Sequence, residues 1–126
     1  MNTRAFGSGR PVSLFTLGTM RALNSAAQMA EVLDAAAAAG INHLETAPAY
    51  GPAERFLGEA LRQNSRTDSD HWVITSKLLP GLSFEEGQRR LDQILERLGC
   101  PQLDNLAIHG IKVVPMPLFT NCISVF

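Results

Sequence analysis

The stretch LETAPAYGPAERFLGEAL, residues Leu44–Leu61, changes from a strand pattern to a helix pattern within a few positions. It continues an apolar run that predicts a strand over Ile41–Thr46. Pro52 suits the first turn of a helix, which we expect to end near Gln63. One face of this helix carries the side chains of Phe56, Leu57, Ala60 and Leu61. The stretch therefore predicts a strand that leads through a short loop into a helix.

The segment before this stretch has the same order of elements. The run PVSLFTLGTM, Pro11–Met20, is short and apolar, and it predicts a strand. A helix over about Ala26–Ala39 follows, because Ser25 and Gln28 have the spacing of a capping box and Gly40 supplies a stop. Its apolar side chains recur at helical spacing at Met29, Val32, Leu33 and Ala36.

The segment after the stretch repeats the order again. After a polar loop over Asn64–Asp70, the run HWVITSK, ending at Lys77, predicts a buried strand. Ser83 and Glu86 form a second capping box, and Leu103–Ile108 predicts a fourth strand. The helix between them ends at Gly99, and its expected apolar face consists of Phe84, Leu91, Ile94, Leu95 and Leu98. Strands that alternate with helices over short connections predict an α/β fold with parallel strands and right-handed crossovers.

Composition narrows the class of protein. With 126 residues, 45% hydrophobic residues and a net charge of -1, the chain reads as one soluble globular domain without the positive charge that nucleic acids attract. No secretory signal pattern opens the chain, and no apolar run approaches the roughly 20 residues that span a bilayer. Cys100 and Cys122 fit no CxxC or metal spacing, so we expect free thiols in a cytoplasmic protein, with no nucleic acid or membrane as partner.

Polar side chains that are able to take part in catalysis lie at or just after the end of each expected strand. Thr19 ends the first, Glu45 the second, Lys77 the third and His109 the fourth, while Tyr50 lies just after the second. Because the carboxyl ends of parallel strands form the ligand-binding rim in α/β folds, we expect these side chains to converge. Each of them alone is more often a surface or packing residue, so the joint placement carries the prediction.

This set of groups suits proton transfer to a carbonyl. A tyrosine has an unperturbed pKa of about 10, and a nearby ammonium lowers that pKa. Lys77 would supply this charge to Tyr50. Glu45 would hold Lys77 by an ion pair, and His109 would orient a substrate oxygen. A carbonyl polarised in this way accepts hydride.

Four short motifs resemble the aldo-keto reductases, which are nicotinamide-dependent (β/α)8-barrel enzymes that reduce aldehydes and ketones. They are LGTM (Leu17–Met20), GINHLETAPAYG (Gly40–Gly51), ITSK (Ile74–Lys77) and LAIHG (Leu106–Gly110). The resemblance runs over roughly Pro11–Ile111, with the motifs in the family's order.

The resemblance implies a role for each matching residue. Tyr50 matches the general acid, Lys77 its pKa-lowering partner and His109 the residue that orients the carbonyl. Glu45 stands where most members have Asp, so its longer side chain has to fold back, or Lys77 has to shift, to keep the ion pair. The strand-one turn that lies beside the cofactor, NADPH by resemblance, corresponds to Gly18, Thr19 and Met20.

Length is the main departure from the family pattern. An eight-stranded barrel needs about 250 residues, so this chain supplies half a barrel, with about four strands and three helices. In the family, the contacts to the nicotinamide amide, phosphates and adenosine come largely from the loops after strands five to eight. We expect an N-terminal turn or flexible arm (residues 1–10), a truncated reductase domain (11–111) and an atypical apolar tail (112–126). In an open half barrel, exposed strand edges favour self-association.

The tail, KVVPMPLFTNCISVF, departs from the family in composition. Pro115 and Pro117 forbid a regular helix there. A strand and a buried cover are two interpretations, and we favour a third, a change of reading frame.

Three hypotheses of function follow. The first is a truncated NADP(H)-dependent carbonyl reductase, and the second is a non-catalytic half-barrel remnant or assembly component. The third is a barrel lyase that uses Lys77 as a Schiff-base nucleophile, which needs a neutral amine and is opposed by Glu45. No metal is expected, because His43, Glu45 and His71 match no metal-binding spacing.

Overall fold

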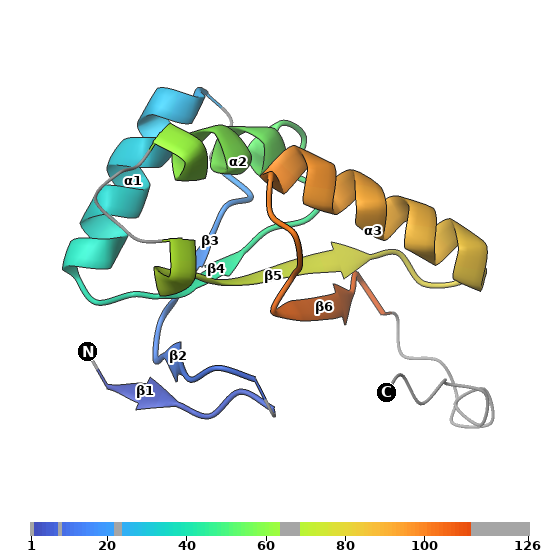
Figure 1. Ribbon diagram of the computed structural model, residues 1–126, viewed down its shortest axis with the longest axis horizontal. Coiled ribbons are helices and arrows are strands. Elements are labelled where there is room, and N and C mark those ends of the chain that lie inside the picture. The colour runs from blue at the N-terminus through green and yellow to red at the C-terminus, as the bar shows by residue number, and fades with distance from the viewer. Residues whose placement is uncertain (1, 8, 22–23, 64–68, 112–126) are drawn as a thin grey trace.

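A four-stranded parallel sheet forms the centre of the protein (Figure 1). The computed structural model describes residues 2–7, 9–21, 24–63 and 69–111. The strands lie in the order β3-β4-β5-β6, which is also their order along the chain. They are β3 (Thr16–Gly18), β4 (His43–Glu45), β5 (Val73–Leu78) and β6 (Asn105–Ile108). All three pairings are parallel, so the predicted α/β class is confirmed.

Three helices connect these strands and cover one face of the sheet (Figure 1). They are α1 (Ala26–Ala38), α2 (Ala53–Gln63) and α3 (Phe84–Leu98), and a short 3-10 helix, η1 (Ser69–His71), precedes β5. The predicted caps are present, because Ser25 accepts a hydrogen bond from the Gln28 amide and Ser83 from the Glu86 amide. Gly99 ends α3 in the left-handed conformation, with φ of 68°, that favours glycine. Residues 64–68 of the expected polar loop lie outside the described residues.

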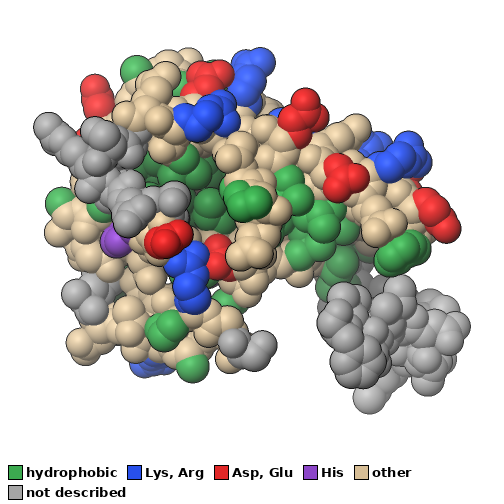
Figure 2. Space-filling view, in the orientation of Figure 1, with side chains coloured by type: hydrophobic (Ala, Val, Ile, Leu, Met, Phe, Trp, Pro, Cys, Tyr) green, Lys and Arg blue, Asp and Glu red, His purple; other side chains and the backbone are tan. Residues whose placement is uncertain are grey.

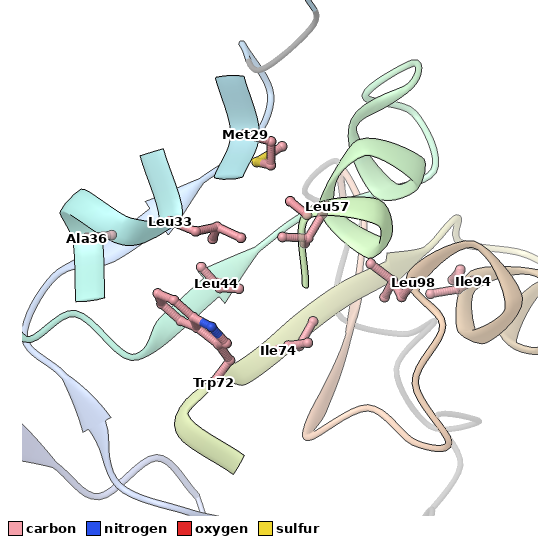
Figure 3. Packing of buried hydrophobic residues seen from close by; sticks show 10 residues of the cluster. Met29, Leu33, Ala36, Leu44, Leu57, Trp72, Ile74, Ile94 and Leu98 are labelled. Carbon is pink, nitrogen blue, oxygen red and sulfur yellow. The ribbon is translucent and has the colours of Figure 1, made fainter. Parts of the chain in front are cut away.

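The hydrophobic core lies between the helices and the sheet (Figure 3). Its largest members come from the three helices and the two central strands: Met29 and Leu33 of α1, Leu44 of β4, Leu57 of α2, Ile74 of β5, Ile94 and Leu98 of α3, and Trp72 just before β5. Full burial of each such side chain contributes roughly 1.5–3 kcal/mol. Leu17, Leu44 and Ile74 align across three strands, so their side chains share the helix-covered face. The residues next to them along each strand therefore point to the other face.

The N-terminal region differs from the prediction. The single strand expected over Pro11–Met20 is wrong, because this segment contains two short strands in different sheets. The second of these is β3, and the first, β2 (Val12–Ser13), pairs antiparallel with β1 (Thr3–Arg4). Leu14 and Phe15 between them are exposed, at 46% and 65%. The apolar run is therefore broken by a bend that places β1 and β2 beside the amino ends of the parallel strands (Figure 1).

Apolar side chains are also exposed at the β6 edge and on α3. Phe84, expected on the apolar face of α3, is 72% exposed because it lies in the first turn, beyond the sheet. Leu106 and Ile108 of β6 are 44% and 50% exposed. Figure 2 shows hydrophobic side chains gathered below α3, where β6 runs. The tail from residue 112 lies outside the described residues, and none of the described helices is both long and apolar enough to cross a membrane.

Candidate active site

Glu45 and Lys77 form an ion pair at the carboxyl end of the sheet. Glu45 is the last residue of β4 and pairs in register with Thr75, two residues before Lys77 on β5. The two side chains therefore lie on the same face of neighbouring strands. Both are partly buried, with 26% of the Glu45 and 15% of the Lys77 side chain exposed. The longer side chain of glutamate thus keeps its contact with the lysine.

Tyr50 reaches this pair from the loop between β4 and α2. The loop is held by two turns, in which the Tyr50 amide donates to the Ala47 carbonyl (3.0 Å) and the Ala53 amide to the Tyr50 carbonyl (3.2 Å). The phenol oxygen accepts a hydrogen bond from Lys77 Nζ at 2.8 Å and donates one to Glu45 Oε1 at 3.2 Å. The ammonium also lies 4.5 Å from the centre of the tyrosine ring, within cation–π range.

Lys77 is held by more than one partner. Besides Glu45 and Tyr50, its ammonium donates to the backbone carbonyl of Thr46 at 3.1 Å. Burial lowers the pKa of the Lys77 ammonium, while a neighbouring carboxylate favours its charged form. The site therefore fixes one cation beside the phenol.

His109 follows β6 directly and faces Tyr50. Its backbone amide donates to the carbonyl of Leu78 at 2.7 Å, which extends the β5–β6 ladder to this residue. The imidazole meets the tyrosine ring edge-on, with ring centres 5.5 Å apart and an interplanar angle of 86°. Strand ends and one loop thus bring together Glu45, Tyr50, Lys77 and His109.

The end of β3 lies on the other side of Glu45. The Thr19 amide donates to the Glu45 carbonyl at 3.0 Å, and its hydroxyl donates to Thr46 Oγ1 at 2.9 Å. A Cβ atom at Gly18 would stand 3.5 Å from Glu45 Oε2, so the missing side chain leaves the carboxylate open on this side. Met20 is 49% exposed. Of the three turn residues, two therefore contact Glu45 or its neighbour and one projects to the surface.

A pocket of about 270 Å³ opens beside Lys77 and His109. Three leucines from the end of β5 and the loop before α3 line it, together with Arg90 of α3 and two residues of the loop that precedes Tyr50. The remaining lining residues are Pro48, Ala49, Leu78, Leu79, Leu82 and Arg90. The pocket is mostly apolar with basic groups at its rim, which suits a small organic molecule with a polar oxygen.

The two remaining histidines have structural partners. His43 is buried on β4, where its ring nitrogens lie 2.9 Å from Thr16 Oγ1 and 2.8 Å from Thr75 Oγ1. His71 Nε2 lies 3.0 Å from the carbonyl oxygen of Ile41. Within the part of the chain that the structure describes, no three His, Cys, Asp or Glu side chains are grouped as metal ligands would be. Cys100 is a free thiol whose pKa is raised by burial.

One polar contact near the site was not predicted from the sequence. Glu54 of α2 is 1% exposed and binds Ser76 and Arg97. The available signal was its position three residues before Leu57, on the apolar side of the helix. A carboxylate at such a position needs a partner inside the protein.

Comparison with known proteins agrees with this geometry. A model of the Aldo/keto reductase family matches residues 14–115. Similar solved structures include a candidate aldo-keto reductase from Pseudomonas aeruginosa, with 34% identity and a TM-score of 0.72 over 86% of this chain and 45% of that protein. An aldo-keto reductase from Bacillus halodurans, in its holo form, has 25% identity and a TM-score of 0.75 over 89% and 41% of the two chains. An aldo-keto reductase from Klebsiella pneumoniae, in complex with NADPH, has 27% identity and a TM-score of 0.69 over 83% and 38%.

The chain spans less than half the length of these three proteins. The four parallel strands and three helices of the described residues are consistent with part of a (β/α)8 barrel, as the resemblance implied. The match to the family model begins just before β3 and extends past β6, so it covers most of the sequence. The chain belongs to the aldo-keto reductase family.

Proposed function

We propose that this site performs the acid–base step of NADP(H)-dependent reduction of an aldehyde or ketone. The observation that carries the proposal is the 2.8 Å hydrogen bond from Lys77 Nζ to the phenol oxygen of Tyr50, with Glu45 paired to the same ammonium. A phenol is a weak acid, and a fixed cation favours the negative charge that develops as the proton leaves.

Each side chain has one task in the proposed step. Tyr50 donates its proton to the carbonyl oxygen, and Lys77 stabilises the resulting phenolate. Glu45 keeps the ammonium in place through the ion pair. His109, whose ring lies edge-on to Tyr50, donates a hydrogen bond that orients the substrate oxygen. The apolar wall of the neighbouring pocket would hold the rest of the substrate.

The described residues fit one end of a nicotinamide cofactor. Gly18 has no side chain beside Glu45, and Thr19 is fixed by its amide and hydroxyl, so the end of β3 offers an open, rigid edge next to the site. Gly18 and Met20 are exposed and would lie against the nicotinamide, whereas Thr19, at 1% exposure, would hold the turn from inside. When bound, the cofactor supplies hydride to the carbonyl carbon. The similar protein from Klebsiella pneumoniae, which was solved with NADPH, supports the choice of cofactor.

The Schiff-base alternative is less well supported. Burial lowers the pKa of Lys77, which is the direction that a nucleophilic lysine needs. However, its ammonium is paired with Glu45 and donates to Tyr50 and Thr46, so the nitrogen lone pair is not available in this arrangement. Borohydride trapping of a carbonyl compound on Lys77 would favour the lyase.

A titration of the purified chain with NADPH tests the proposal against the non-catalytic alternative. The emission of NADPH itself is the appropriate signal, because the protein's single tryptophan, Trp72, is buried at 2% exposure. We expect a saturable change in emission, and we expect Gly18→Leu to weaken it by filling the edge beside Glu45. If no saturable binding occurs, this polypeptide is a half barrel without reductase function.

A further inference from the structure

Glu54 forms a buried polar junction between three elements. Its Oε1 accepts a hydrogen bond from Ser76 Oγ of β5 at 2.7 Å, and its Oε2 accepts one from Arg97 Nε of α3, also at 2.7 Å. The Glu54 side chain is 1% exposed, whereas 37% of Arg97 is exposed. Ion pairs buried in this way often contribute little net stability, because removing the charges from water is costly. What such a junction does provide is a fixed geometry.

The junction is close in sequence to both members of the proposed proton-transfer pair. Ser76 immediately precedes Lys77, and Glu54 lies four residues after Tyr50. The chain between Tyr50 and Glu54 is held by the hydrogen bond from the Ala53 amide to the Tyr50 carbonyl. Only a short length of backbone separates the junction from Tyr50 and Lys77. A shift of Glu54 or Ser76 therefore also moves the phenol or the ammonium.

The junction does not contact the pocket. Successive side chains of a strand point to opposite faces, so Ser76 faces the helices while Lys77 faces the site. Ser76 is completely buried, and neither Glu54 nor Arg97 lines the pocket. Any influence of Glu54 on the site must therefore act through Ser76 and the backbone.

We infer that Glu54 is a positioning residue, which ties β5 to α2 and α3 through Ser76 and Arg97 and thereby keeps Lys77 within hydrogen-bond distance of Tyr50. The inference depends on the proposed function only for the meaning of the Lys77–Tyr50 contact. The contact itself is measurable without cofactor, substrate or turnover.

The amino-acid composition provides a direct reporter. The chain contains one tyrosine, so a protein labelled with ¹³C at the tyrosine Cζ gives a single NMR signal, from Tyr50. The Cζ shift responds to the hydrogen bonds and charges at the phenol oxygen. Lys77→Met defines the signal of a phenol that has lost the ammonium. The wild type and this variant thus calibrate the measurement.

Two variants break the junction in different ways. Glu54→Gln keeps the side-chain shape but removes the charge, and Ser76→Ala removes only the hydroxyl. We expect both to move the Tyr50 signal most of the way from its wild-type position to that of Lys77→Met. Glu96→Gln is the matched control, because Glu96 is exposed and adjacent to Arg97. It should leave the signal unchanged.

Fluorescence of Trp72 and circular dichroism identify variants that fail to fold. If Glu54→Gln unfolds because Arg97 loses its counter-charge, the double variant Glu54→Gln/Arg97→Met removes both charges and takes its place. A wild-type Tyr50 signal in folded Glu54→Gln and Ser76→Ala would show that the junction only stabilises the fold, and would overturn the inference. A shift in Glu54→Gln without one in Ser76→Ala would also overturn it, because the effect would then be long-range electrostatics.

The two proposals fail separately. If the expected shifts occur while the wild type binds no NADPH, the positioning role stands and the reductase function falls. If NADPH binds and both junction variants keep the wild-type signal, the reductase function stands and the positioning role falls.

Discussion

Lys77 lies two residues beyond the point where β5 pairs with Glu45, and the two side chains still meet in an ion pair. Both occupy the face of the sheet opposite the helices, on strands that are about 4.8 Å apart. The lysine therefore has to reach back along the strand direction, and the extra methylene of glutamate relative to aspartate shortens the distance to cover. The glutamate and lysine side chains together therefore span the offset between their positions on the two strands.

Removal of the Glu45 charge should change the ionisation of Lys77. The carboxylate favours the ammonium, so Glu45→Gln is expected to lower the pKa of Lys77 further below the value that burial already sets. The chain contains two lysines, and a Lys112→Arg background leaves Lys77 as the only one. Its pKa can then be measured by ¹³C NMR of the Cε atom. Glu31→Gln, an exposed change on α1, is the control, and an equal or higher pKa in Glu45→Gln would contradict this electrostatic role.

Tyr50→Phe should separate catalysis from binding. The variant keeps the ring that packs against His109 but lacks the proton that we assign to the carbonyl oxygen. If the chain reduces an aldehyde with NADPH, we expect kcat to fall by roughly 10²–10⁴, the usual contribution of general acid–base catalysis, with little change in NADPH affinity. Oxidation of NADPH followed by absorbance measures the rate. A variant with wild-type kcat would exclude Tyr50 as the acid.

Two helical glycines should respond in opposite ways to alanine. A Cβ atom at Gly58 of α2 would stand 2.2 Å from the Arg97 carbonyl oxygen of α3, so the helices would have to separate. We expect Gly58→Ala to cost about 1–3 kcal/mol or more of unfolding free energy. At Gly87 of α3 the nearest atom would be Leu78 Cδ1 at 3.8 Å, an ordinary contact, and alanine should add roughly 0.5–1 kcal/mol through its helix propensity. Urea unfolding compares the two, and equal effects would refute the close-packing argument.

His43 should make the protein less stable in mild acid. Burial lowers the pKa of its imidazole, and the carboxylate of Asp104 opposes this only in part. The folded protein therefore binds this proton less readily than the unfolded chain, whose histidine titrates near 6.5. The stability from the neutral ring is fully present above about pH 6.5. It is lost as the pH falls from there toward the lowered folded pKa.

The free energy of unfolding, measured in urea at a series of pH values, tests this sign. His43→Gln can keep hydrogen bonds to Thr16 and Thr75 but cannot titrate, so it should lack the part of the pH dependence that begins near 6.5. If the free energy of unfolding of the wild type instead rises as the pH falls below about 6.5, the buried ring prefers its charged form.

Local signals predicted the helices and the strand ends well. The capping serines and Gly99 mark helix ends through contacts within a few residues, so their spacing is visible in the sequence. Parallel strands then place their carboxyl ends at one edge, and this geometry brings Lys77 and His109 next to the loop that carries Tyr50. The positions of these side chains can therefore be predicted from the order of strands, loops and helices along the chain.

Contacts between distant parts of the chain could not be predicted in the same way. The hairpin of β1 and β2 has too few residues to show an alternating pattern. The bend at Leu14 lies inside the apolar run Pro11–Met20, so the run was interpreted as one strand. Glu54 and Arg97 are 43 residues apart, so their ion pair appears only once α2 and α3 pack together. Arg89 of α3 is exposed, whereas the carboxylate of Glu54 lies on the buried side of α2.

Arg10 binds the opposite end of the sheet from the candidate active site. Its guanidinium donates to the backbone carbonyls of Asp70 and Trp72 before β5 and to the carboxylate of Asp104 before β6, and a second oxygen of Asp104 accepts from the Ile74 amide. One side chain thus joins the hairpin to the amino ends of two strands. The contacts that anchor the hairpin and the candidate active site therefore lie at opposite ends of the strands. A fluorophore, an affinity handle or a surface linkage attached upstream of Arg10 would therefore lie at the end of the sheet away from the candidate active site, which makes the N-terminal hairpin a suitable place to immobilise this protein.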